Sequence, residues 1–159
     1  MEFNFLAILV AAIVPIFIGF LWYNPKTFGN AWMHASGLTT ESLKGGNMIK
    51  IFVVTFILSF MLAFILPSLV IHQMGAYSLT QGDLGALPSY DAFLKDYGMA
   101  FRTFKHGTFH GVISGIFLAL PIIGINALFE RKSAKYIFIN SGYWILTLGI
   151  MGAIICGWK

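Results

Sequence analysis

Four long stretches without a single charged residue constrain the fold of this chain more than any other feature. They cover residues 5–23, 51–71, 107–129 and 136–157. The hydrocarbon core of a bilayer is about 30 Å thick, and roughly 20 helical residues cross it. Backbone amides cannot stay unpaired in lipid, so a stretch of this kind crosses as a helix. The sequence therefore predicts an all-α integral membrane four-helix bundle.

The composition excludes a water-soluble globule. Only 10% of the residues are charged and 58% are hydrophobic, whereas ordinary soluble domains carry roughly 25% charged residues. Four apolar helices in 159 residues would leave too little polar surface to cover them. The net charge of +4 comes from 10 basic and 6 acidic residues, so it reflects few charges, and we expect no nucleic-acid partner.

The connections predict two helical hairpins within a single transmembrane domain, residues 1–159. The link at residues 130–135 is short, so the third and fourth spans pack as a tight antiparallel pair. The longest loop, residues 72–106, carries aromatic side chains at helical spacing with charged residues between them. This pattern predicts an amphipathic interfacial helix at about residues 90–105 that leads into the third span.

Aromatic residues surround the end of the first span, where Asn24 and Pro25 stop the helix. Trp and Tyr rings concentrate at membrane–water interfaces. We expect a short interfacial helix near residues 27–34 and a second one beginning at Thr39 or Thr40. The predicted interfacial aromatic residues are Trp22, Tyr23, Phe28 and Trp32.

The basic residues of the loops predict the orientation in the membrane. Six lie in the two loops on one side and four on the opposite side, where acidic residues accompany them. The six are Lys26, Lys44, Lys50, Arg131, Lys132 and Lys135, and the four are Lys95, Arg102, Lys105 and Lys159. The positive-inside rule then places both termini outside, which is the periplasm for a protein of the bacterial inner membrane.

Small residues at every fourth position predict how the spans pack. Lipid is as apolar as leucine, so membrane helices associate by close backbone approach and by hydrogen bonds. The third and fourth spans carry such stripes at Gly107, Gly111, Gly115, Ala119, Gly149, Ala153 and Gly157.

Two further kinds of residue within the spans have structural consequences. Pro15, Pro67 and Pro121 each remove a helical hydrogen bond, so kinks are expected there.

Asn126 and Asn140 lie about equally far from the middle of the 130–135 link. We therefore expect them at similar depth, joined by an interhelical hydrogen bond.

Three histidines are predicted to share the outer face. His106 and His110 are four residues apart at the start of the third span, so they project from one helix face, and His72 ends the second span. Three convergent imidazoles can form an open site for zinc, copper, iron or nickel, and two can ligate a haem axially. Interfacial histidines that bind only water or lipid head groups give the same pattern, as does a pH-sensing or proton-relay role. The simplest prediction is no cofactor, with a transition metal or haem as the alternative.

Known catalytic patterns are missing from the sequence. It contains no nucleophile elbow, phosphate-binding loop or kinase motif. No Asp or Glu lies inside a predicted span, which argues against an ion-coupled symporter. We therefore expect no enzymatic activity.

Three segments carry a resemblance to a known family. Residues 19–33 (GFLWYNPKTFGNAWM) resemble the signature of a family of small bacterial membrane proteins, the domain-of-unknown-function family 1761. Residues 127–133 (ALFERKS) and 140–144 (NSGYW) are similar to that family's last hairpin. The resemblance implies four helices in a bacterial inner membrane, and it implies no activity.

These features favour a non-enzymatic membrane protein that forms a homo-oligomer or serves as an accessory subunit of a membrane complex. Its expected partners are the lipid bilayer and either a second copy or another membrane protein. One alternative is a metal- or haem-binding membrane redox protein that uses the outer-face histidines. The other is a passive channel or small-solute transporter, which the prolines and glycines allow.

Overall fold

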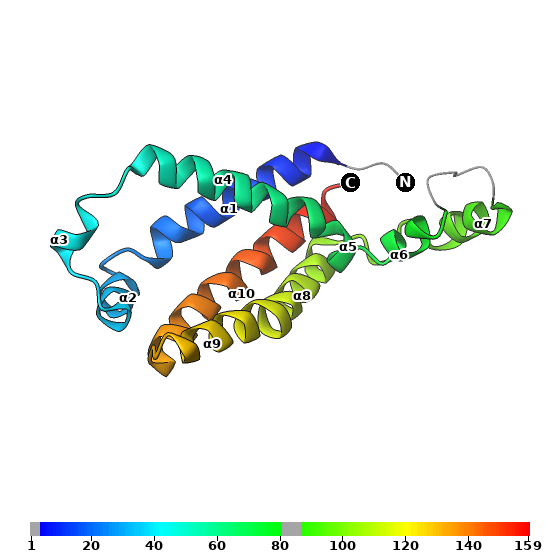
Figure 1. The fold of residues 1–159 in the computed structure, drawn as a ribbon. Helices are drawn as coiled ribbons and strands as arrows, with labels where there is room; N and C mark the ends of the chain where they lie inside the picture. The colour runs from blue at the N-terminus through cyan, green and yellow to red at the C-terminus, as the bar shows by residue number, and fades with distance from the viewer. Residues whose placement is uncertain (1–3, 81–86) are drawn as a thin grey trace.

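Four long helical segments run back and forth through the molecule (Figure 1). The structure, a computed structural model, describes residues 4–80 and 87–159, and within these ranges it contains helices and turns but no strand. The four segments are long and apolar enough to cross a membrane. They are Phe5–Trp22, Met48–Val70, Phe104–Phe129 and Ala134–Gly157. The predicted all-α architecture with four candidate spans is confirmed.

Two of the spans are continuous helices and two are interrupted. The first span is α1 (Phe5–Trp22) and the last is α10 (Ala134–Gly157). The second consists of α4 (Met48–Ile65) and α5 (Pro67–Val70), and the third of α8 (Phe104–Ser114), the π-helix η1 (Gly115–Ala119) and α9 (Leu120–Phe129). The described connections contain four short helices, α2 (Gly29–Ser36), α3 (Thr40–Leu43), α6 (Gln73–Ser78) and α7 (Pro88–Tyr97).

Each span begins at a polar residue that caps its first turn. The side-chain oxygen of each cap accepts a hydrogen bond from the backbone N–H three residues later, which satisfies a donor that the helix itself leaves free. The four caps are Asn4, Asn47, Thr103 and Ser133. The last three spans therefore begin before the predicted residues 51, 107 and 136. Those predictions excluded charged residues, but a lysine in the first turn can extend its ammonium group to the membrane surface.

The prolines interrupt two spans where a backbone donor is missing. Pro67 begins α5 directly after the end of α4. Pro121 follows the π-helix η1, whose wider turn comes just before the position without an N–H. Pro15 stays within α1, and its carbonyl oxygen accepts a hydrogen bond of 2.8 Å from the hydroxyl of Tyr143 in α10.

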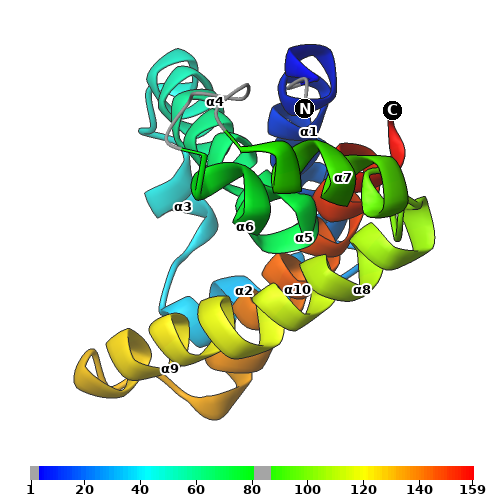
Figure 2. The ribbon, with the colours of Figure 1, turned by 90° about the vertical axis from the view of Figure 1, so that its right-hand side faces the viewer.

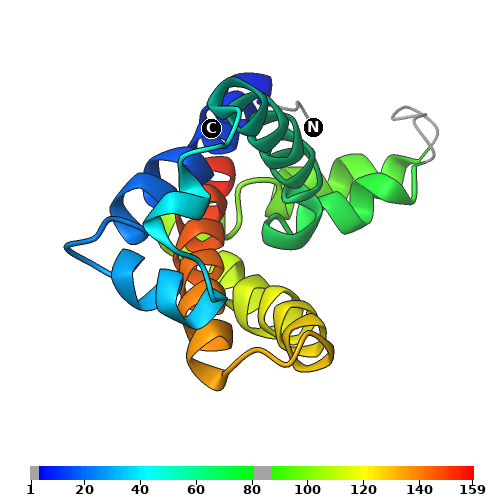
Figure 3. The same ribbon diagram turned by 60° about the vertical axis from the view of Figure 1, so that its left-hand side comes forward.

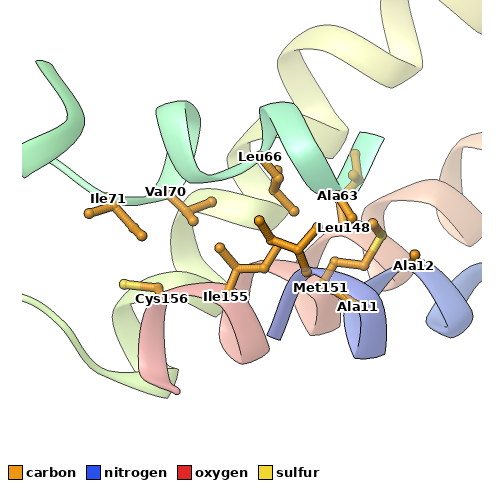
Figure 4. Close-up of a cluster of buried hydrophobic side chains, with 11 residues drawn as sticks. Ala11, Ala12, Ala63, Leu66, Val70, Ile71, Leu148, Met151, Ile155 and Cys156 are labelled. Atoms are coloured by element: carbon orange, nitrogen blue, oxygen red, sulfur yellow. The ribbon is translucent and has the colours of Figure 1, made fainter. Parts of the chain in front are cut away.

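The core lies where α1, α4, α5 and α10 meet. Side chains from the three spans point toward one another in this cluster (Figure 4). Small residues of α1 and α4 allow the larger side chains of α10 to reach it. The buried members are Ile8, Ala11, Ala12, Ala63, Leu66, Val70, Ile71, Leu148, Met151, Ile155 and Cys156.

The glycine stripe of α8 lets the backbones of α8 and α10 touch. A Cβ atom at Gly107, Gly111 or Gly115 would collide with backbone atoms of α10. Gly152 of α10 is the reciprocal position, since its own Cβ would collide with the backbone at Gly107. The close approach in α10 thus involves Gly152, whereas the predicted Ala153 is only half-buried. The rest of the predicted stripe is also in place, because Gly149 faces Val112, Gly157 faces Phe104 and Ala119 packs against the core.

The predicted amphipathic helix at residues 90–105 is shorter in the structure. Helix α7 ends at Tyr97, and α8 begins only at Phe104. Between them Phe101 has φ of +61°, a left-handed conformation that ends any helical path. Of the loop before α7, residues 81–86 lie outside the described part of the chain.

The predicted hydrogen bond between Asn126 and Asn140 is not formed. Asn140 instead accepts a hydrogen bond of 2.9 Å from the hydroxyl of Tyr23 and donates one of 2.8 Å to the carbonyl of Tyr136. Asn126 is exposed on the outer side of α9, whereas its neighbour Ala127 is fully buried. Helical phase therefore turns Asn126 away from the interface with α10.

Asn4, the first described residue, and the C-terminal residues lie at the same end of the bundle. The side-chain amide of Asn4 donates a hydrogen bond of 3.4 Å to the carbonyl of Trp158. The view along the bundle shows α6 and α7 at this end, in front of the spans (Figure 2). Helices α2 and α3 lie at the opposite end (Figure 1).

Candidate metal centre

Three histidines converge where α5 gives way to α6 and α8 begins. His72, His106 and His110 each offer one ring nitrogen, and these three nitrogens lie within 4.8 Å of one another. The Nε2 atoms of His72 and His106 are 2.9 Å apart, so one imidazole donates a hydrogen bond to the other. The ring centroids of His106 and His110 are 4.5 Å apart. The structure thus brings together the three residues that the sequence singled out.

Two features of the helices create this convergence. The Thr103 cap fixes the start of α8, so His106 and His110 lie one turn apart on the same face. The second span is broken at Pro67 and ends at Val70, and the extended backbone of Ile71 then turns the chain toward α8. His72 follows this turn and is exposed, whereas His106 and His110 are half-buried.

The ring of Phe101 covers one side of the cluster. It is stacked on His106, with ring centroids 4.9 Å apart, and it meets His72 edge-on at 5.7 Å. Its positive φ is unfavourable for a bulky residue, at roughly 1–3 kcal/mol. Strain of this kind persists only where the surroundings hold the residue in place, and it occurs often at functional sites.

Two buried polar side chains hold the turn that carries Phe101. The side-chain amide of Gln73 donates hydrogen bonds to the carbonyls of Tyr97 and Ala100, at 2.6 and 2.8 Å. Arg102 donates from Nε to the carbonyl of Cys156 at 3.1 Å, which ties the same turn to the end of α10. Sequence reasoning did not assign Phe101, Gln73 and Arg102 to the site. Their roles depend on contacts across the fold, and the only local signal was the position of Gln73 beside His72.

The geometry of the cluster suits a metal ion. In a tetrahedral site with metal–nitrogen bonds of about 2.0–2.1 Å, the nitrogens are separated by roughly 3.4 Å. The separations here, from 2.9 Å to at most 4.8 Å, bracket that value. A bis-histidine haem needs room for its macrocycle between the two imidazoles, and the contact of 2.9 Å between His72 and His106 leaves no such room between this pair.

Three neutral imidazoles leave part of the coordination sphere of a metal ion free. No Asp or Glu among the described residues belongs to the cluster. A divalent ion would therefore keep its charge and bind water, hydroxide or another anion in the open position. This arrangement allows a bound water to lose a proton more easily or an anionic ligand to bind.

The predicted interfacial aromatic residues gather at the other end of the bundle. Trp22 lies against Phe28, with ring centroids 4.4 Å apart, and donates from its indole to the carbonyl of Ile139 at 3.0 Å. Tyr23 meets Trp32 edge-on at 5.1 Å. His34 is also in this region, in α2, and is exposed. It therefore takes no part in the cluster of the other three histidines.

The partly buried hydroxyl of Tyr23 makes the stability of this end of the bundle sensitive to alkaline pH. Burial raises the pKa of its hydroxyl above the ordinary value near 10, and the nearby Tyr143 and Tyr136 raise it further. As the pH rises, the Tyr23 hydroxyl ionises in the unfolded chain before it does in the folded one. The protonated hydroxyl therefore stabilises the fold fully below about pH 10, and this stabilisation is lost as the pH rises toward the folded pKa.

We expect the free energy of unfolding to fall above about pH 10 and the fall to be smaller in Tyr23→Phe. Denaturant titrations in detergent across this range measure it, with Tyr97→Phe, at an exposed position, as the matched control. An unchanged slope in Tyr23→Phe would contradict the assignment.

Comparison with known families identifies a match over nearly the whole chain. The model of a family described as "Protein of unknown function (DUF1761)" matches residues 6–156. No curated protein and no solved structure matches the chain.

Proposed function

From the premise that this chain belongs to the DUF1761 family of proteins of unknown function, we propose that it is a membrane protein that binds a divalent transition metal. The single observation that carries this proposal is the convergence of His72, His106 and His110, whose ligand nitrogens lie within 4.8 Å of one another. His72 follows the second span, whereas His106 and His110 lie at the start of the third, so the fold and not the local sequence brings His72 to the other two. Imidazole sites of this kind take zinc, copper, nickel or iron.

The position of the site supports exchange of the metal with water. His72 is exposed, and the cluster lies at the end of the bundle where α1 begins and α10 ends. In the orientation predicted from the loop charges, this end faces the periplasm of a bacterial inner membrane. Metal in that compartment would reach the histidines without crossing the bilayer.

Metal binding by the purified chain tests the proposal. The protein should carry a tag without histidine, be stripped with a chelator in detergent, and be titrated with Zn²⁺ and Co²⁺. We expect one bound equivalent by elemental analysis after gel filtration, and a visible Co²⁺ spectrum that reports nitrogen ligands. Metal that remains far below stoichiometric after equilibration with either ion would overturn the proposal.

Oligomer formation, service as an accessory subunit and passive transport remain predictions. Only 17% of the apolar window of Met48–Val70, and likewise of Phe104–Phe129, is buried inside the molecule, and lipid covers such surfaces as well as a partner does. The absence of enzymatic activity likewise stays a prediction. None of them conflicts with a metal site, and cross-linking in gentle detergent together with flux into proteoliposomes would test them.

A further inference from the structure

A second candidate site lies at the end of the bundle opposite the histidines. The structure contains a cavity of about 600 Å³ between α1, α2, α4 and α10. Figure 3 brings this end of the molecule forward. Pockets for small molecules have volumes of this order, with mainly apolar or aromatic walls and a few polar groups.

Aromatic rings form much of the wall of this cavity. Tyr23 lies 5.1 Å from Trp32 and 5.2 Å from Tyr143, centroid to centroid, and in both pairs the rings are inclined to each other. Phe20 and Phe52 form another pair, 5.6 Å apart. Aromatic rings bind flat conjugated molecules by offset stacking and edge-to-face contact. An acyl chain alone would gain nothing specific from them.

A glycine keeps the cavity open. A Cβ atom at Gly19 would find no heavy atom nearer than the hydroxyl oxygen of Tyr143, at 3.8 Å. Helix packing therefore does not require a glycine here, in contrast to Gly111. The missing side chain instead adds space beside the two tyrosine rings.

The polar groups of the cavity favour a neutral ligand that accepts hydrogen bonds. The hydroxyls of Tyr23 and Tyr143 already donate to Asn140 and Pro15. The side-chain N–H₂ of Asn24 and the hydroxyl of Thr55 donate to none of the described residues, so both remain available. Charged side chains are absent from the described lining.

We propose that this cavity binds a neutral, lipid-soluble ring compound with carbonyl oxygens, of the quinone type. The rings of Tyr23, Trp32 and Tyr143 contact its faces and edges, and Asn24 and Thr55 donate hydrogen bonds to its carbonyl oxygens. The cavity lies where α1 ends and α4 begins, near the level at which a head group of this kind meets the membrane surface. The proposal does not depend on the metal site at the other end.

Quenching of tryptophan fluorescence by decylubiquinone tests the proposal, because Trp32 lines the cavity. The titration uses the full chain in detergent with a chelator present, which keeps it separate from any metal binding. We expect a saturable component in the natural protein and its loss in Gly19→Leu, whose new side chain projects into the cavity beside the ring of Tyr143. Gly124→Leu is the matched control. Gly124 is also half-buried in a span, and a Cβ atom placed there would lie 3.8 Å from its nearest neighbour, a side-chain atom of Ile137. It should retain the saturable component.

A second variant and a competitor make the test independent of the folding of Gly19→Leu. Thr55→Val keeps the side-chain shape but removes one donor, so we expect binding weaker by about 2- to 12-fold, the equivalent of one ordinary hydrogen bond. An alkylbenzene with the same tail should compete poorly because it has no carbonyl oxygen. Quenching that never saturates, unchanged affinity in both Gly19→Leu and Thr55→Val, or equal competition by the alkylbenzene would each overturn the proposal.

Discussion

Substitution of His110 by alanine is expected to abolish stoichiometric metal binding. The change leaves two imidazoles, which are too few to hold a divalent ion against water and buffer in an otherwise ligand-free site. Loss of an outer partner of a metal ligand already weakens binding about 10- to 100-fold, so loss of a ligand should weaken it by more than about 100-fold. Elemental analysis and the Co²⁺ spectrum of the stripped and reloaded protein measure the effect.

The chain provides its own control in His34. This histidine is exposed in α2, at the end of the bundle away from the cluster. His34→Ala should therefore bind metal like the natural protein, whereas His72→Ala and His106→Ala should behave like His110→Ala. Equal binding by His110→Ala and His34→Ala would show that the metal sits elsewhere. Circular dichroism of each variant separates a lost ligand from a lost fold.

Substitution of Gly111 by valine is expected to cause a large loss of stability. A Cβ atom there would collide with the backbone at Leu148 and come within 2.9 Å of Gly149. Backbone atoms cannot turn aside as a flexible side chain can, so α8 and α10 must separate. Overpacking usually destabilises by 1–3 kcal/mol, and we expect about 3 kcal/mol or more here. Thermal unfolding in detergent, followed by circular dichroism, measures the loss.

Gly124→Val is the matched control for this prediction. It makes the same chemical change within the third span, but the nearest atom to the new Cβ is a side-chain methyl group of Ile137 at 3.8 Å. We expect a shift in stability within about 0.5 kcal/mol, as for most substitutions that meet no special contact. If Gly111→Val were as stable as Gly124→Val, the close packing of α8 on α10 would be wrong.

The sequence predicted the four spans well because lipid imposes a simple requirement. Any segment that crosses the hydrocarbon must be apolar, helical and about 20 residues long, and these properties depend on the segment alone. The glycine stripe of α8 was predictable for a similar reason, since membrane helices rely on close backbone contact in place of a hydrophobic driving force. The convergence of His106 and His110 needed only the helical period.

The sequence could not predict contacts that depend on the relative rotation and position of the spans. Asn126 and Asn140 lie at matching distances from their link, but only the packed structure shows that Asn126 faces outward while Asn140 meets Tyr23. Phe101 gave no local sign of its positive φ. Contacts with two other helices hold its turn: Gln73 of α6 donates into the turn, and Arg102 within the turn donates to Cys156 of α10.

The sequence by itself therefore determined that this chain is all helical, which segments can enter a bilayer, and that two histidines share one face of the third span. Tertiary structure alone decided how closely His72 approaches these two histidines, that a phenylalanine in a strained turn covers the cluster, and that aromatic side chains from four helices enclose a cavity at the opposite end. The physical reason is that burial in lipid acts on each helix separately, whereas a site depends on the relative placement of several helices.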